Sequence, residues 1–217
     1  MIPALWTSPP LTAEESARWT TSEERAAAAG FVSERRRAEF LTWRAVVRRE
    51  LGDDVGIAYD ALGAPVLTNR AVHISVAHCA GRIAVCASPE RCAVDIEPAT
   101  RDFRRAASRY LTPEEEALSD DPLLPGIVWC AKETLYKYAG RRELDFRRDL
   151  HVVRLDLAAG TLAGRIGNGE PVRLSVSLDE GFILVYILFN ASEAVNRNAE
   201  DRLRSHGRFW LPKLPQP

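Results

Sequence analysis

Residues 72–97 read VHISVAHCAGRIAVCASPERCAVDIE and contain three short apolar segments separated by two turns. Apolar and polar residues alternate in segments 72–78 and 92–97, whereas segment 83–87 is apolar throughout. Short segments of this kind, separated by turns that contain glycine or proline, are typical of β-strands. The stretch therefore predicts a three-stranded β-meander.

Two helical segments are predicted before the meander. The first covers residues 12–29, with Thr12 and Ser22 as candidate N-caps because glutamates follow each of them closely. A stronger helix begins at Ser33 and extends to about residue 51, where a glycine ends it. This second helix is strongly basic, and its arginine-rich face is either simply solvated or a binding surface for phosphate. The arginines are Arg35, Arg36, Arg37, Arg44, Arg48 and Arg49.

A helical region and a second set of strands follow the meander. The helical region covers residues 102–139 and is interrupted at prolines. Strands are then predicted at 151–157, 161–166, 171–177 and 182–189. This order favours an α+β fold of two halves, residues 1–100 and 101–217, each with helix and meander. The polar and then proline-rich segment 196–217 is expected to lie on the surface.

Length and composition exclude several classes of protein. The 217 residues suffice for one large domain or two packed halves, and the net charge of −1 gives no sign of nucleic-acid or membrane binding. The longest apolar run, residues 182–189, is too short to span a bilayer. The first residues lack the pattern of a signal peptide, and the 4 cysteines lack zinc-binding spacing. We therefore expect a cytoplasmic protein with reduced, mostly buried thiols.

Asp95 and Glu97 are the first candidate site residues. Residues i and i+2 of a strand face the same side, so both carboxylates point together while Val94 and Ile96 face the core. Two carboxylates this close repel each other unless a cation lies between them, and Mg²⁺ prefers such oxygen ligands. The alternative is a solvated polar face, which is common on half-exposed strands.

The second candidate group lies on the segment 129–140, WCAKETLYKYAG. On a helix one stripe would carry Trp129, Lys132, Glu133, Tyr136, Lys137 and Gly140. Glu133 could supply a third carboxylate to a metal ion, and the two lysines could neutralise phosphates. A simple Glu133–Lys137 salt bridge on an amphipathic helix is the alternative. His78, at the end of a strand, is either a phosphate donor or a structural residue.

Taken in order, five motifs resemble the surfactin-type 4′-phosphopantetheinyl transferases, the larger and pseudo-dimeric class. The most specific pair is Val-Asp-Ile-Glu at 94–97 with Trp-x-x-Lys-Glu-x-x-x-Lys-x-x-Gly at 129–140. The others are Arg-x-x-Phe-Leu-x-x-Arg at 37–44, Ile-Ser-Val-Ala-His at 74–78 and Tyr-Leu-Thr-Pro-Glu-Glu at 110–115. The resemblance implies two similar halves packed as a pseudo-dimer, with the site between them, and therefore a monomer.

The resemblance also implies an activity and its site residues. The enzyme would move the phosphopantetheine arm of coenzyme A onto a serine of an apo acyl, peptidyl or polyketide carrier protein. Asp95, Glu97 and Glu133 would hold Mg²⁺, and the phosphates would meet Lys132, Lys137 and His78. Coenzyme A would further contact Arg37 or Arg44 and the segment Gly63-Ala-Pro65. Either Glu114 or Glu115 matches the acidic position of the family.

The chain departs from the family pattern at three places. Ala77 replaces a usual serine or threonine before His78, Ala64 replaces a cation, and Cys130 follows Trp129. A degenerate homologue that binds carrier protein or coenzyme A without catalysis is therefore a second interpretation. An unrelated Mg²⁺-dependent phosphohydrolase is a third, although it would need a further water-activating residue near the carboxylates.

Overall fold

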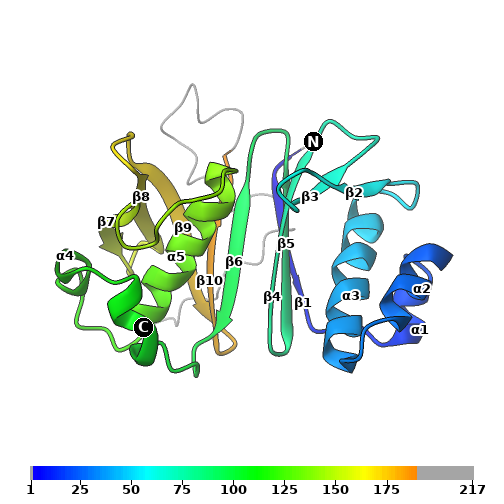
Figure 1. Ribbon diagram of the computed structural model, residues 1–217, viewed down its shortest axis with the longest axis horizontal. Coiled ribbons are helices and arrows are strands. Elements are labelled where there is room, and N and C mark those ends of the chain that lie inside the picture. Colours follow the sequence, from blue (N-terminus) through cyan, green and yellow to red (C-terminus); the bar gives the residue numbers. More distant parts are fainter. Residues whose placement is uncertain (1, 190–217) are drawn as a thin grey trace, which may run out of the picture.

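The computed structural model describes residues 2–189 and has a mixed α+β fold, as predicted (Figure 1). Its helices are α1 (Ala13–Ala17), α2 (Ser22–Ala29), α3 (Glu34–Leu51), α4 (Pro113–Glu116) and α5 (Leu124–Ala139), with the 3₁₀ helix η1 (Arg104–Arg109). The first strands are β1 (Ala4–Ser8), β2 (Ile57–Tyr59), β3 (Pro65–Leu67), β4 (His73–Cys79) and β5 (Arg82–Ser88). The others are β6 (Ala93–Pro98), β7 (Leu150–Asp156), β8 (Thr161–Ile166), β9 (Val172–Asp179) and β10 (Phe182–Ile187).

The helix predicted from Ser33 is confirmed as α3. The Ser33 hydroxyl accepts a hydrogen bond from the backbone N–H of Arg36, and Gly52 ends the helix at a φ of 119°. The first predicted helix is divided into α1 and α2. Thr12 caps α1 as expected, but Thr21 rather than Ser22 caps α2, because Thr21 and Glu24 form a reciprocal capping box.

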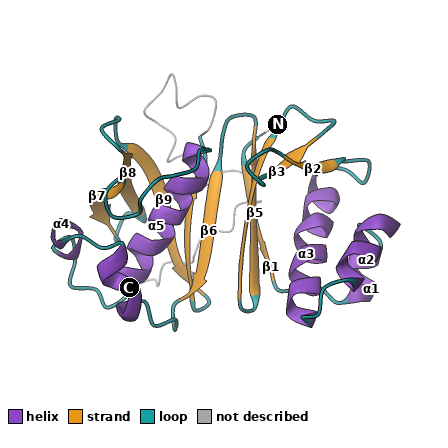
Figure 2. Ribbon diagram, in the orientation of Figure 1, coloured by secondary structure: helices purple, strands orange, loops and turns teal. Residues whose placement is uncertain are grey.

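The first sheet has the order β1-β5-β4, and α3 covers one face of it (Figure 2). Trp43, Val46 and Val47 of α3 pack there against Ile74 and Val85 of the sheet. A separate two-stranded hairpin, β2-β3, lies at the end of α3 (Figure 1). Strands β1, β2 and β3 were not predicted from the sequence.

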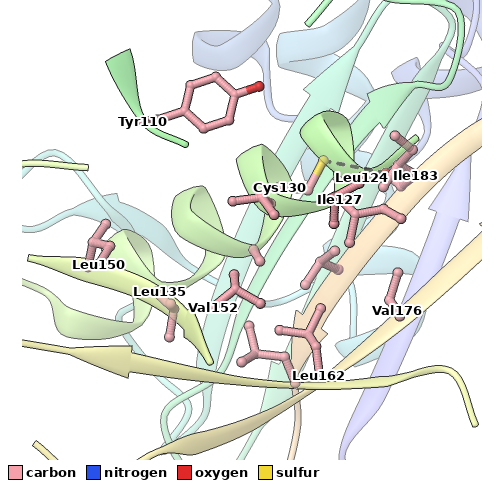
Figure 3. Packing of buried hydrophobic residues seen from close by; sticks show 14 of the residues in the cluster. Tyr110, Leu124, Ile127, Cys130, Leu135, Leu150, Val152, Leu162, Val176 and Ile183 are labelled. Atoms are coloured by element: carbon pink, nitrogen blue, oxygen red, sulfur yellow. Dashed lines mark hydrogen bonds between the residues drawn. The ribbon is translucent and has the colours of Figure 1, made fainter. Parts of the chain in front are cut away.

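The second sheet has the order β6-β10-β9-β8-β7, with α5 packed on one face. Figure 3 shows this core, in which side chains of α5 such as Ile127 and Leu135 meet the strands at Val152, Leu162 and Val176. The four strands predicted after the central helix are confirmed as β7 to β10, to within two residues at each end. The predicted segment 196–217 lies outside the described residues.

The predicted three-stranded meander is wrong in its pairing, although its three strands are present as β4, β5 and β6. Strand β5 lies between β1 and β4, so both of its edges are already paired. Strand β6 instead pairs antiparallel with β10 in the second sheet, although it belongs to the predicted half 1–100. The two sheets differ in the number and order of their strands, and the pseudo-dimeric relation stays a prediction.

An apolar cluster joins the two sheets where β4 lies beside β6 (Figure 1). The Ser75 hydroxyl accepts a hydrogen bond from the Val94 N–H at 3.2 Å, and the Cys92 thiol donates to the His73 carbonyl at 3.5 Å. Both contacts join residues 19 positions apart, so the two strands run in the same direction. The ends of β4 and β6 therefore lie close together.

The cysteines agree with the expectation of reduced and buried thiols. All four are free and buried, at positions 79, 86, 92 and 130. Burial raises the pKa of the Cys79 thiol to about 12, so it stays protonated at neutral pH. In the part of the chain that the structure describes, no helix is long and apolar enough to cross a membrane.

Candidate active site

Asp95 and Glu97 of β6 face α5, not the solvent. Their partners on β10 are Val185 and Ile183, and both of these belong to the core beneath α5. Asp95 is only 8% exposed. The two carboxylates point to the same side of β6, as predicted from their i, i+2 spacing. Because α5 covers that side, the site is more enclosed than a strand surface.

The polar stripe of α5 meets these carboxylates along the length of the helix. Lys137 Nζ donates to Asp95 Oδ1 at 2.8 Å and to the Val94 carbonyl at 2.9 Å. Trp129 lies at the other end of the stripe, and its indole N–H donates to Glu97 Oε1 at 3.3 Å. Glu133 lies between these two positions in the sequence and interacts electrostatically with both β6 carboxylates. Four of the predicted residues are therefore brought together: Asp95, Glu97, Glu133 and Lys137.

The group carries more negative charge than its cations neutralise. Burial, followed by the charge of Asp95, raises the pKa of Glu133 to about 7, although Lys137 acts in the opposite direction. Burial likewise raises the pKa of Glu97 against the attraction of Arg101. Among the described residues, no hydrogen-bond partner reaches Asp95 Oδ2, which is buried. An unpartnered carboxylate oxygen in this position is costly unless a cation meets it.

The donor set fits a divalent cation. Carboxylate oxygens are the ligands that Mg²⁺ prefers, and Asp95 Oδ2 makes no hydrogen bond within residues 2–189, although the Asp95 carboxylate interacts with the Cys130 thiol. Over the same residues, no group of three or more His, Cys, Asp or Glu side chains is already arranged as a metal site. Asp95, Glu97 and Glu133 would therefore have to converge on the ion, from oxygens that Lys137 and Arg101 now contact.

Arg101 is a site residue that the sequence did not reveal. It follows β6 and forms an ion pair with Glu97 Oε1, the oxygen that also accepts from the Trp129 indole. Its guanidinium lies 5.4 Å from the centre of the Trp129 ring and 5.0 Å from that of Phe103. The only sequence signal is its i, i+4 spacing from Glu97, which indicates contact on a helix but not in the turn observed here.

Lys132 lies apart from the carboxylate group. Its side chain is fully buried, and its ammonium donates to Glu115 Oε2 at 2.8 Å and to the Tyr110 carbonyl. The other oxygen of Glu115 accepts from the Val152 N–H at 2.8 Å. The pair thus joins α4 and β7 to α5. Of the two candidate acidic positions, Glu115 is buried and forms this pair, whereas Glu114 is exposed.

His78 lines a separate cavity of about 170 Å³ between α3, β4 and the β2-β3 hairpin. The imidazole Nδ1 lies 3.3 Å from Glu39 Oε2. Burial lowers the pKa of His78, while the charge of Glu39 opposes this effect. The lining residues are Arg36, Glu39, Phe40, Trp43, Tyr59, Pro65, Val76 and His78. The lining combines aromatic rings with one cation, one imidazole and the Glu39 carboxylate, and the rings suit a ligand with a planar part.

The two arginines predicted to bind coenzyme A are held by the protein itself. Arg44 is 4% exposed, lies 3.4 Å from Glu24 Oε1 and donates to the Tyr59 hydroxyl at 2.8 Å. It therefore supports the cavity wall from behind. Arg37 donates to the Val32 carbonyl at 3.3 Å, and Arg36 is the arginine that lines the cavity. Gly63 is in the hairpin turn, at a φ of 86°, two residues before Pro65.

The glycine at position 140, the last position of the helix motif, is explained by the local structure. It ends α5 in the left-handed conformation, with φ 57° and ψ 38°. An added Cβ would lie 2.2 Å from Nη1 of Arg91, the atom that donates to the Tyr138 carbonyl at 2.9 Å. Both the backbone conformation and the close approach of Arg91 favour glycine here.

Comparison with known proteins gives a family match over part of the chain. Residues 91–186 match a model of the 4′-phosphopantetheinyl transferase superfamily. The matched segment contains Asp95, Glu97, Glu133 and Lys137, whereas His78 and the cavity lie outside it. A search of curated proteins found no match to the chain. The family match supports a transferase that moves phosphopantetheine.

Proposed function

We propose that this protein transfers the 4′-phosphopantetheine group of coenzyme A to a serine of an apo carrier protein. The reaction depends on Mg²⁺ and releases adenosine 3′,5′-bisphosphate. One observation carries the proposal: within the segment that matches the family, Asp95 and Glu97 of β6 face Glu133 and Lys137 of α5. Cytoplasmic location and a monomeric state, both expected from the sequence, belong to the same proposal.

The carboxylate group would hold the pyrophosphate end of coenzyme A. Asp95, Glu97 and Glu133 would bind Mg²⁺, which neutralises charge on the pyrophosphate when it is bound. The Lys137 ammonium lies at the edge of this group, 2.8 Å from Asp95 Oδ1, and would contact a phosphate oxygen. Lys132 is fully buried against Glu115, so its ammonium is not assigned to a phosphate.

The cavity beside His78 would hold the adenosine end of coenzyme A. Phe40, Trp43 and Tyr59 provide aromatic walls for the adenine ring, and Pro65 closes the hairpin side. His78 and Arg36 would meet phosphate oxygens at the edge, in place of the predicted Arg37 and Arg44. Arg44 contributes by holding the Tyr59 hydroxyl at 2.8 Å.

The transfer itself needs no nucleophile from the protein. The serine oxygen of the carrier attacks the β-phosphorus, the phosphorus–oxygen bond to the adenosine bisphosphate breaks, and the leaving oxygen takes that electron pair. The serine proton passes to a carboxylate of the group or to solvent. The chain contributes by orienting the pyrophosphate and by placing cationic groups near the charge that develops.

The test combines the full chain, coenzyme A, Mg²⁺ and several apo carrier proteins, and measures carrier mass by mass spectrometry. A gain equal to phosphopantetheine is expected with the wild type and not with Asp95→Asn. Asp120→Asn, an exposed position, serves as the matched control and should keep the activity. Tight coenzyme A binding without any mass gain would instead identify a non-catalytic binder. Release of inorganic phosphate without transfer would identify a phosphohydrolase.

A further inference from the structure

The pairing of Glu97 with Arg101 leaves one proposed metal ligand occupied by a cation of the protein itself. Arg101 Nη1 donates to Glu97 Oε1, and the Glu97 side chain is 16% exposed. The neutral Trp129 N–H donates to the same oxygen at 3.3 Å. A divalent ion at that oxygen would lie at close range to the guanidinium, and two cations in such a position repel each other strongly.

Arg101 is better able to leave its carboxylate than Lys137 is. The Arg101 side chain is 45% exposed, on the turn directly after β6, whereas the Lys137 side chain is 29% exposed. Lys137 is also held by the Val94 carbonyl at 2.9 Å, in addition to Asp95. The backbone around Arg101 is fixed, because Arg101 N–H donates to the Pro98 carbonyl at 3.0 Å. A change of side-chain rotamer, with the backbone in place, would release Glu97.

The aromatic surroundings give the displaced side chain a place to rest. The guanidinium already lies near the rings of Phe103 and Trp129, at 5.0 and 5.4 Å from their centres. Contact between a cation and an aromatic ring is stabilising, so the guanidinium would keep these contacts when it leaves Glu97. A turn of the side chain away from Glu97 and toward these rings would therefore be a short movement.

We propose that Arg101 is a positioning residue that competes with the divalent ion for Glu97 and thereby weakens metal binding in the free protein. The inference rests on the metal site of the proposed function. According to this inference, Arg101 lowers the affinity for the metal ion. The exposure of its side chain alone would indicate only a simple surface salt bridge. Removal of the guanidinium should tighten metal binding, which is the opposite of the effect expected for a residue that merely stabilises the site.

The test is a titration of the full chain with Mn²⁺ in the absence of coenzyme A, with free Mn²⁺ counted by electron paramagnetic resonance. Arg101→Gln should bind Mn²⁺ about twofold to fivefold more tightly than wild type, as expected for loss of an ion pair whose arginine is 45% exposed. The Mn²⁺ affinity of Arg101→Lys should fall between those of wild type and Arg101→Gln. Arg105→Gln is the matched control, since Arg105 is 90% exposed and pairs with Asp102 rather than with a site carboxylate; its affinity should stay near wild type.

The outcomes separate this inference from the proposed function. Glu97→Gln should weaken Mn²⁺ binding if the metal site is real. Unchanged or weaker binding by Arg101→Gln, with Glu97→Gln weakened, overturns the role of Arg101 and leaves the metal site in place. Equal tightening by Arg101→Gln and Arg105→Gln overturns direct competition in favour of general electrostatics. An absence of Mn²⁺ binding by every form overturns both assignments.

Discussion

The Lys132 ammonium lies 2.8 Å from Glu115 Oε2, and both side chains are almost completely excluded from solvent. Burial lowers the pKa of Lys132, while the hydrogen bond and the charge of Glu115 oppose that effect. The remaining oxygen of Glu115 is held by the Val152 N–H. This buried pair fixes α5 against α4 and β7, and so fixes the helix that carries Glu133 and Lys137.

Loss of either partner should therefore destabilise the protein. We expect Lys132→Met to lower the free energy of unfolding by about 3–5 kcal/mol, because it leaves an uncompensated buried carboxylate. The double variant Lys132→Met/Glu115→Leu should cost less than the two single changes combined. Urea unfolding monitored by circular dichroism measures this, with exposed Glu114→Gln as the control. Full additivity would contradict a direct pair.

The raised pKa of Glu133 predicts a dependence of stability on pH in the metal-free protein. The folded-state pKa is about 7, above the ordinary value of 4.5, so the folded state binds the proton more tightly than the unfolded state does. This contribution is fully present below pH 4.5 and is lost as the pH rises through 7. Glu133→Gln should therefore stabilise the metal-free protein at pH 8, on the order of 2 kcal/mol.

Urea unfolding of wild type and Glu133→Gln in the presence of a chelator, at pH 5 and at pH 8, measures this effect. The difference between the two proteins should be larger at pH 8. The exposed Glu116→Gln serves as the control and should show no such increase. A difference that is the same at both pH values would show that the folded environment does not raise the pKa of Glu133.

Gly140→Ala should destabilise the end of α5. The left-handed backbone costs an alanine about 1 kcal/mol, and the new Cβ must also displace the Arg91 side chain. Gly167→Ala is a closely matched control, because Gly167 has the same φ of 57° but nothing lies within 4 Å of the added Cβ. We expect thermal unfolding to show a larger loss for Gly140→Ala. Equal losses would mean that Arg91 moves aside without cost.

His78→Gln should weaken coenzyme A binding about tenfold, as expected for loss of one hydrogen bond to a charged phosphate. His73→Gln is the control, since His73 is an exposed residue at the opposite end of β4. Isothermal titration with coenzyme A gives both dissociation constants. Similar weakening in the two variants, or none in His78→Gln, would remove His78 from the proposed binding cavity.

The local features of the fold were predictable because they depend on neighbouring residues. Hydroxyl caps and glycines located α3, and alternation located β4, β6 and the strands after α5. The pairing of β6 was not predictable in this way. It depends on β1, at the far end of the chain, which occupies the edge of β5 that a meander would have given to β6. Such a long-range competition leaves no mark in the sequence of β6 itself.

The candidate site was likewise predictable from the sequence only in part. The spacing of Asp95, Glu97, Glu133 and Lys137 was sufficient to place them together. Lys132 was misjudged because neighbouring helix positions differ by about 100° around the axis, so Lys132 stands at the edge of the stripe and turns toward Glu115 instead of β6. Arg101 and the lining of the cavity depend on turns and on the approach of α3 to β4, for which periodicity gives no rule.

The single passage of the chain between the two sheets has a practical consequence. Within residues 2–189, the chain crosses between the sheets only from Ser88 to Ala93, and the apolar cluster around Cys86 and Val94 holds the sheets together. A chain cleaved there would keep the strand pairing of both sheets intact. Each fragment would carry one part of the site, His78 on one and Asp95 on the other. Recovery of transferase activity on mixing would then report fragment complementation.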